Sequence, residues 1–385
     1  MIQKVSFRNF KAYRSLELEL EHFTVLVGPN ASGKTTLLNG LHFVSRAAEY
    51  IHADRTGHME QDQALHSHGV NSPVEFMVSG VWEGTVGLVR LRGVTYNVPT
   101  GNRGVEEKLR FEVFGEWGGQ DFPLQTEIRG GGPEAAEARF KPSLSVLRNA
   151  MGATAVLRFE PRKLMDASYS VEENPALQSD GGGLASVLAH LKLSHDEVFD
   201  EIESALRQIV PAVRRIRLER VLVTQTQSSR PTSPGSSVWG NRIVLDMQGA
   251  KGVPADAAGE GTLMALGLLA VVKGTTKPRL VLLDDIELGL HPTAQGKLIE
   301  VLRKIQEHDP ELQIVARSHS PFILNYLDPK EVRMTFLAEN GFARCEKLTA
   351  HPEFERWKDL MSPGEFWSTV GESWVGKASE PTTHE

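Results

Sequence analysis

A glycine-rich loop between an apolar strand and a helix constrains this chain more than any other stretch. The loop reads Gly28-Pro29-Asn30-Ala31-Ser32-Gly33-Lys34-Thr35-Thr36. Residues 23–27 before it are apolar and rich in β-branched types, as in a buried strand, and residues 37–41 after it start a helical pattern. A G-x-x-x-x-G-K-[ST] match between a strand and a helix predicts a phosphate-binding loop. We therefore expect a nucleoside triphosphate site.

The residue types of the loop match this chemistry. Gly28 and Gly33 permit the turn, so that neighbouring backbone N–H groups point inward as a nest for an anion. The N-terminus of the following helix adds the positive end of its dipole. The Lys34 ammonium is predicted to reach the β- and γ-phosphates, and the Thr35 hydroxyl to bind Mg²⁺.

The composition is that of an ordinary globular protein. The chain has 385 residues, 40% of them hydrophobic and 24% charged, which is enough for one large domain or several lobes. No apolar run approaches the ~18 residues of a membrane-spanning helix. The only cysteine is Cys345, so a disulfide within the chain is impossible and we expect a reducing cytoplasm. The net charge of −7 gives no global electrostatic case for nucleic-acid binding.

Periodicity predicts the elements of the first half. Residues 2–8 and 15–19 alternate as half-buried strands do, and the β-rich runs of residues 74–116 predict an antiparallel side sheet. Residues 50–75 and the glycine-rich residues 117–135 are predicted as surface loops. The histidines of the first loop lack any recognised ligand spacing, which favours a solvated loop over a metal site: His52, His58, His66 and His68.

The second half alternates helices, strands and one linker. Residues 184–206 carry apolar side chains at helical spacing, and Pro211 ends the pattern. Residues 215–224 return to strand, and residues 226–237 form a hairpin tip or linker. We therefore expect an N-terminal lobe with the phosphate loop, a helical insert, a C-terminal lobe and an aromatic-rich tail: residues 1–165, 166–225, 226–350 and 351–385.

Two acids follow an apolar strand in the C-terminal lobe. Residues 280–283 precede Asp284 and Asp285, which places both carboxylates at the carboxyl edge of a parallel sheet. Asp284 is predicted to hold Mg²⁺, directly or through water, and Asp285 is the candidate base for the attacking water. Alone, the pair could be two solvated acids after a core strand; their occurrence with the phosphate loop favours a site.

Two further segments complete the candidate site. His319 follows the apolar strand of residues 313–317 and can donate a hydrogen bond to the γ-phosphate or the attacking water. The turn Gly259-Glu260-Gly261 opens an apolar helix, whose first N–H groups can bind an anion. By itself, this turn is more typical of a helix start in the core.

The order of these parts resembles the ATPases of the ABC superfamily, in the branch of RecF, SMC heads and OLD-type proteins. More narrowly, it is similar to bacterial predicted AAA-family ATPases encoded near phage-defence genes. The segments that carry the resemblance are residues 5–13, the phosphate loop, Asp284–Pro292 (DDIELGLHP), Ser318–Pro321 (SHSP) and residues 364–374. The resemblance implies an α/β ABC-type head: a parallel sheet with the phosphate loop, an antiparallel side sheet and a helical insert.

The resemblance also implies roles for residues. Asp284 is the metal-binding acid, Asp285 stands where the family has its catalytic Glu, and His319 is the switch histidine. Residues 259–262 take the signature position, which contacts the γ-phosphate bound by a second subunit. Two ATP molecules with Mg²⁺ are thus expected between two copies arranged head to tail.

Two departures from the family pattern point toward slow hydrolysis. The signature usually begins with Ser, and Gly259 lacks that hydroxyl donor, although the helix dipole remains. Asp285 is one methylene shorter than Glu, so the attacking water is shifted or Glu287 assists. Steady-state turnover of several per second would refute this expectation.

Absent motifs narrow the function. An Asn-Lys-x-Asp motif is missing, which favours ATP over GTP, and no Leu-Ser-Gly-Gly-Gln signature of transporters occurs. SMC-type arms are not expected between Lys34 and Asp284, and no clustered nuclease acids follow Pro321. We predict a cytoplasmic, ATP-dependent homodimerising switch in DNA maintenance or anti-phage defence, with a separate nuclease-type effector and no membrane. Alternatives are an ATP-binding scaffold with negligible hydrolysis and a RecF-like DNA-binding repair ATPase.

Aromatic residues gather in the C-terminal tail: Phe354, Trp357, Phe366, Trp367 and Trp374. Buried against the core, they would be ordinary packing. Exposed, they would mark a docking surface for a partner protein.

Overall fold

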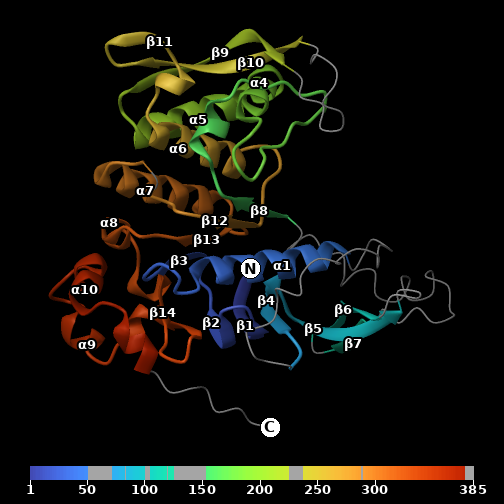
Figure 1. Cartoon of the computed structure of the whole chain (residues 1–385). Helices are drawn as coiled ribbons and strands as arrows, with labels where there is room; N and C mark the ends of the chain where they lie inside the picture. The colour runs from blue at the N-terminus through green and yellow to red at the C-terminus, as the bar shows by residue number, and fades with distance from the viewer. Residues whose placement is uncertain are drawn as a thin grey trace. The chain divides into compact units, whose positions relative to one another are not determined.

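The computed structural model describes residues 1–50, 72–82, 84–99, 105–118, 120–124, 153–224, 237–287 and 289–377 (Figure 1). The chain divides into two units. Unit 1 comprises Met1–Thr154 and Glu311–Glu385, and unit 2 comprises Ala155–Pro310. Unit 1 is therefore built from both ends of the chain. The four functional segments expected from the sequence follow motif order rather than packing, and they stay a prediction.

An antiparallel sheet of six strands forms one layer of unit 1, in the order β2-β1-β4-β5-β6-β7. Side chains of β4 alternate between buried and half-buried positions, which is the pattern of a sheet with one core face. The predicted side sheet is thus confirmed. Its strands are β1 (Ile2–Phe10), β2 (Tyr13–Glu19), β4 (Glu75–Trp82), β5 (Thr85–Pro99), β6 (Val105–Trp117) and β7 (Gln120–Leu124).

Strand β7 corrects one expectation, because it lies inside the surface loop expected over residues 117–135. Trp117 of β6 pairs with Gln120 of β7, and Gly118 between them has a φ of 58°. A positive φ is what a two-residue hairpin turn requires. The glycine that indicated a loop therefore closes a hairpin.

The second sheet of unit 1 carries the phosphate loop. Strand β3 (Phe23–Val27) pairs in parallel with β13 (Gln313–Arg317) on one side and with β14 (Val332–Leu337) on the other. β15 (Ala343–Lys347) adds an antiparallel edge to β14. All five residues of β3 are buried, as expected for a central strand of a parallel sheet.

Helix α1 (Lys34–Tyr50) follows the loop and packs on the antiparallel sheet. A Cβ at Gly40 would lie 2.6 Å from the Phe7 ring, so glycine lets the helix approach β1 closely. Phe7, Phe10 and Phe76 meet edge to face with centroids 5.0–5.8 Å apart, and Phe43 of α1 stacks on Phe76. These rings form the core between α1 and the antiparallel sheet.

The C-terminal segment folds onto unit 1. It contains short helices: α8 (Pro321–Leu324), α9 (Phe354–Trp357), α10 (Pro363–Val370) and the 3₁₀ turns Pro329–Glu331, Leu348–Ala350 and Ser373–Lys377. Phe354, Phe366 and Trp367 are buried, and Trp367 Nε1 donates to Glu372 at 2.8 Å. The packing interpretation of the tail therefore holds for these three aromatics. A Cβ at Gly364 would lie 2.1 Å from the Pro321 carbonyl oxygen, so α10 presses directly on the start of α8.

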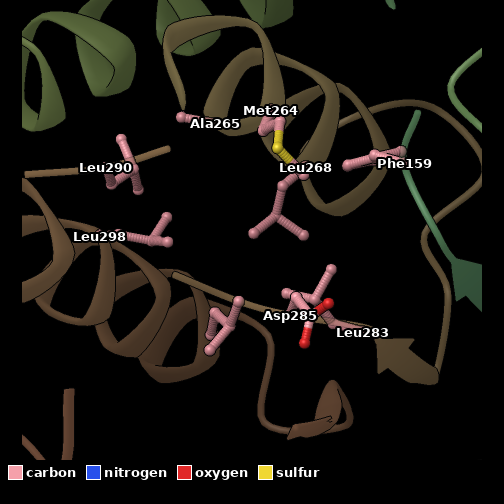
Figure 2. Close-up of a pocket in the computed structure, with 9 residues that line it drawn as sticks. Phe159, Met264, Ala265, Leu268, Leu283, Asp285, Leu290 and Leu298 are labelled. Atoms are coloured by element: carbon pink, nitrogen blue, oxygen red, sulfur yellow. The ribbon is translucent and has the colours of Figure 1, made fainter. Parts of the chain in front are cut away.

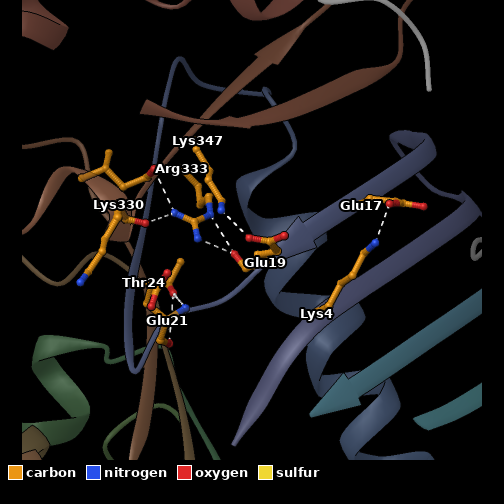
Figure 3. Close-up of polar contacts among 9 residues, drawn as sticks. Lys4, Glu17, Glu19, Glu21, Thr24, Lys330, Arg333 and Lys347 are labelled. Carbon is orange, nitrogen blue, oxygen red and sulfur yellow. Dashed lines mark hydrogen bonds and ion pairs between the residues drawn. The ribbon is translucent and has the colours of Figure 1, made fainter. Parts of the chain in front are cut away.

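The buried side chain of Arg333 connects strands β14 and β2 of unit 1 through hydrogen bonds (Figure 3). The Arg333 side chain on β14 donates to the Glu19 carbonyl oxygen from Nε at 2.9 Å and from Nη2 at 2.6 Å, and Nη1 donates to the carbonyls of Lys330 and Val332. The Glu19 carboxylate pairs with Lys347, which lowers the pKa of Glu19. Burial lowers the pKa of Arg333, and the carbonyls compensate part of its desolvation.

Unit 2 is built around an apolar helix. In α6 (Glu260–Val272) every residue from Gly261 onward is buried. Such a helix lies inside a bundle. The surrounding helices are α3 (Pro161–Met165), α4 (Leu184–Ser194), α5 (Asp196–Ile209) and α7 (Pro292–His308). The helices predicted over residues 184–206 are thus confirmed, with α5 ending just before Pro211.

Strands complete unit 2. β9 (Val213–Thr224), β10 (Ser237–Met247) and β11 (Ala250–Pro254) form an antiparallel sheet, and a 3₁₀ turn (Ala255–Ala257) leads into α6. β12 (Leu280–Leu283) is fully buried and adjoins β8 (Thr154–Leu157).

Most of two expected segments lies outside the described residues: the histidine-bearing loop of residues 50–75, with all four of its histidines, and the linker of residues 226–237, whose last residue begins β10. In the part of the chain that the structure describes, no helix has both the length and the apolar character that crossing a membrane requires.

Candidate nucleotide-binding site

The predicted phosphate loop has the backbone of an anion nest. Gly28 has a φ of 143°, Gly33 of 98° and Ala31 of 62°, so three loop residues adopt a conformation that favours glycine. A Cβ at Gly28 would lie 2.2 Å from the Thr335 carbonyl oxygen. Both loop glycines are therefore required by backbone angle, and Gly28 also by close approach.

Lys34 is the first residue of α1, and its ammonium lies inside the loop. The side chain is buried, and Nζ donates to the carbonyl oxygens of Gly28 at 2.7 Å and Pro29 at 2.6 Å, with Ser32 Oγ at 3.5 Å. The first N–H groups of a helix have no partner within that helix, and they carry the positive end of its dipole. One loop thus gathers an ammonium and helix N–H groups.

Thr335 of β14 supports the loop from below and was not foreseen from the sequence. Its hydroxyl lies 2.5 Å from Ser32 Oγ and donates to the Val27 carbonyl at 3.0 Å. Thr335 is fully buried. It links the end of β3 to the middle of the loop across 303 positions of sequence.

Tyr13 of β2 lies under the other loop glycine. A Cβ at Gly33 would be 2.8 Å from the Tyr13 hydroxyl oxygen and 2.7 Å from the Ala343 Cβ. Tyr13 is fully buried, and burial raises its pKa well above 10.0. The tyrosine that ends the first quoted segment of the family resemblance therefore has a structural role beneath the loop.

The residue types of the loop fit a bound triphosphate. The loop offers N–H groups and an ammonium, and the lack of a Cβ at Gly28 and Gly33 lets it pack closely on Thr335 and Tyr13. The predicted metal ligands, the Thr35 hydroxyl and the Asp284 carboxylate, are oxygen donors, which Mg²⁺ prefers. Among the described residues no cluster of three His, Cys, Asp or Glu side chains offers an alternative metal site.

The predicted switch segment follows β13 in unit 1. His319 is exposed, two residues beyond the strand end, and Ser318 N donates to the Leu26 carbonyl at 2.9 Å. Arg317, which the sequence interpretation did not assign to the site, donates from Nη1 to Thr35 Oγ1 at 2.8 Å. The structure thus brings the end of β13 to the start of α1.

Asp284 directly follows β12 in unit 2, as predicted. Its backbone N–H donates to the Leu157 carbonyl at 2.9 Å, and its side chain is 15% exposed. Arg158 Nε lies 3.9 Å from Asp284 Oδ2. The backbone hydrogen bond and the burial hold this carboxylate at the strand end.

Asp285 has an unusual backbone and surroundings. Its φ is 53°, in the left-handed region that aspartate tolerates better than most residues. Figure 2 shows its side chain on the wall of a small cavity of about 10 Å³, which is near the minimum for one water molecule. The remaining lining is apolar: Phe159, Met264, Ala265, Leu268, Leu283, Ile286, Leu290 and Leu298.

The signature turn contacts the segment that contains Glu287. Gly261 is buried, and a Cβ there would lie 2.4 Å from the Gly289 carbonyl oxygen. Gly289 has a φ of 66°, and Glu287 O accepts from Leu290 N at 3.0 Å, which closes a turn. Gly259, the N-cap, and Glu260 are exposed at the start of α6. Gly261 is therefore a packing glycine, while Gly259 and Glu260 face outward.

The structure therefore groups the predicted site residues into two sets. Unit 1 holds the loop from Gly28 to Thr36 and the segment of His319; unit 2 holds Asp284, Asp285, Glu287 and the turn at Gly259–Gly261. Their joint action on one nucleotide stays a prediction.

A loop of this geometry on a strand between parallel neighbours, with an antiparallel side sheet, is the arrangement of a P-loop nucleotide-binding head. The fold matches solved SMC heads. One is the SmcHead bound to the C-winged helix domain of ScpA, with a TM-score of 0.53 and 14% identity over 92% of this chain and 99% of that one. Another is the Smc head domain with an extended coiled coil bound to the C-terminal domain of ScpA derived from Pyrococcus furiosus, with a TM-score of 0.51 and 14% identity over 93% and 99%.

The family itself is given by residues 23–325, which match the family described as "AAA domain, putative AbiEii toxin, Type IV TA system". The chain belongs to this family of P-loop ATPases.

Proposed function

We propose that this protein binds Mg²⁺·ATP, hydrolyses it slowly, and uses ATP binding to bring two copies together. The switch acts in anti-phage defence or DNA maintenance and controls a separate, nuclease-type effector. The observation that carries the proposal is the phosphate loop, in which Lys34 Nζ lies inside a turn closed by Gly28 and Gly33. Membership of an AAA family supports ATP as the nucleotide.

The protein's own residues supply the chemistry in this proposal. The Lys34 ammonium and the N–H groups of residues 30–36 bind the phosphates, and Thr35 with Asp284 provides oxygen ligands for Mg²⁺. Bound Mg²⁺ neutralises charge on the β- and γ-phosphates. Asp285, assisted by Glu287, takes a proton from the attacking water, and His319 orients that water. The products are ADP and phosphate.

A partner protein is supported by two comparisons. The description of the matching family includes the words "putative AbiEii toxin, Type IV TA system", which are consistent with a defence setting. Both solved SMC heads are described as bound to a domain of ScpA, so heads of this fold engage other proteins. For this chain, an effector is proposed on those grounds.

The experiment compares the parent with Lys34→Ala and with Lys358→Ala, a matched exposed lysine of unit 1. The dissociation constant of a fluorescent ATP analogue and the molecular mass in solution are measured with and without ATP. Loss of a charge-assisted contact in Lys34→Ala should weaken binding at least about tenfold and abolish ATP-dependent dimers. Lys358→Ala should behave like the parent. A Lys34→Ala protein with the parent's affinity would contradict the proposal.

A scaffold that binds ATP but barely hydrolyses it is the second candidate. The observation that favours it is Asp285, whose side chain borders an apolar cavity. ATPase rates of the parent and Asp285→Ala separate the two functions. Equal, very slow rates with intact ATP-dependent assembly would establish the scaffold; a clear drop in Asp285→Ala would establish the slow ATPase.

A further inference from the structure

Arg317 lies beside the phosphate loop although no sequence motif marks it. It is the last residue of β13 and pairs in register with Leu26, two residues before the loop begins. Its half-buried side chain reaches across to α1, where Nη1 donates to Thr35 Oγ1 at 2.8 Å. An arginine from the far end of the chain thus contacts the second residue of α1.

The hydroxyl that Arg317 contacts is the predicted Mg²⁺ ligand. The Thr35 hydroxyl oxygen has two lone pairs, and one of them accepts from the guanidinium of Arg317. A Mg²⁺ ion on the other lone pair would lie close to this guanidinium, and the two cations would repel each other. The contact between Arg317 and Thr35 therefore opposes magnesium binding at this oxygen.

The position of this arginine has an electrostatic cost that an anion would remove. The guanidinium lies at the first turn of α1, where the helix dipole is positive and where cations are unfavourable. Lys34, whose ammonium is buried, directly precedes Thr35 in the same helix. A polyphosphate is the ligand that offsets such a concentration of positive charge, and a guanidinium fork binds phosphate in a bidentate manner.

We infer that Arg317 is a phosphate-binding residue of the nucleotide site. Its guanidinium holds Thr35 Oγ1 before the metal binds, and it moves to the triphosphate oxygens when Mg²⁺ takes the threonine hydroxyl. In the absence of Mg²⁺, Arg317 supplies part of the positive charge that the metal would bring. This inference rests on the proposed function, because it needs a triphosphate in the loop.

The experiment is a titration of a fluorescent ATP analogue in excess Mg²⁺ and in excess EDTA. In EDTA, Arg317→Ala should bind about tenfold to a hundredfold more weakly than the parent, the range expected for a lost hydrogen bond to a charged group. In Mg²⁺, the loss should be smaller. Arg317→Lys keeps the positive charge but not the planar guanidinium, so its affinity in EDTA should lie between those of the parent and of Arg317→Ala. Arg356→Ala, an exposed arginine of the same unit, is the matched control and should equal the parent.

A second readout is the Mg²⁺ concentration that gives half-maximal enhancement of ATP binding. It should fall in Arg317→Ala, because the competitor for Thr35 Oγ1 is gone. If Arg317→Ala does not fold, as judged by its melting curve, Arg317→Lys and Arg317→Gln carry the same comparison.

The outcomes separate the two proposals. A parent protein that binds no ATP in either buffer overturns the proposed function and this inference with it. A parent that binds ATP, together with an Arg317→Ala variant of equal affinity in EDTA, overturns the role of Arg317 alone.

Discussion

Replacing Thr335 by valine tests how the phosphate loop is held. Valine keeps the shape of threonine and removes the hydroxyl, which lies 2.5 Å from Ser32 Oγ and donates to the Val27 carbonyl. Each buried hydrogen bond contributes about 0.5–1.5 kcal/mol, and an acceptor left without its partner adds to the loss. We therefore expect the free energy of unfolding to fall by about 1–3 kcal/mol.

The same change should weaken ATP binding, because Ser32 loses its anchor in the middle of the loop. If about 1 kcal/mol of loop order is lost, the dissociation constant rises about fivefold. Urea unfolding measures the first effect, and titration with a fluorescent ATP analogue measures the second.

Thr335→Ser is the control for this prediction, since it keeps the hydroxyl and deletes a buried methyl group. It should lose about 1 kcal/mol of stability while retaining the parent's ATP affinity. If the valine variant binds ATP as tightly as the serine variant, the hydroxyl does not support the loop and the reasoning is wrong.

Three further predictions concern packing and pH. Gly261→Ala should lower the melting temperature strongly, because its Cβ would lie 2.4 Å from a loop carbonyl. The Cβ of Gly259→Ala meets only one atom, at 3.8 Å, so this variant should lose only the small preference for glycine at an N-cap and melt closer to the parent. Gly364→Ala should destabilise the C-terminal helix against Pro321, which limited proteolysis followed by mass spectrometry would detect as earlier cleavage in the tail. Burial raises the pKa of the Cys345 thiol from 9.0 to about 12, so its contribution to stability is complete below pH 9 and is lost as the pH rises toward 12, by at most about 1.4 kcal/mol per pH unit. Urea midpoints from pH 8 to 10 should therefore fall less steeply in Cys345→Ala than in the parent.

The sequence predicted those parts of the site that form one contiguous motif. Residues 28–36 could be found because their residue types and their flanking strand and helix all indicate the same turn. The strand before Asp284 and the strand before His319 could be found for the same reason, since each is a short apolar run ending in polar residues. Local patterning carries this information without knowledge of the fold.

Contacts between distant segments could not be predicted in this way. Thr335 is an ordinary strand residue by type, and only the parallel pairing of β14 with β3 places its hydroxyl at the loop. Arg317 looks like a polar residue at a strand end until the register with Leu26 shows what it can reach. The sequence also does not show that both ends of the chain belong to unit 1. Periodicity depends on neighbours in sequence and carries no information about which strands pair in a sheet.

The position of β3 between β13 and β14 has a consequence for synthesis of the protein. A ribosome that has completed residue 310 has made the loop sequence but neither strand that flanks it. The nascent chain therefore cannot place the loop between its two neighbouring strands until β13 and β14 have been made, and we expect a product truncated before β13 to carry the motif without binding nucleotide. By this topology, the loop sequence alone does not make a nucleotide site.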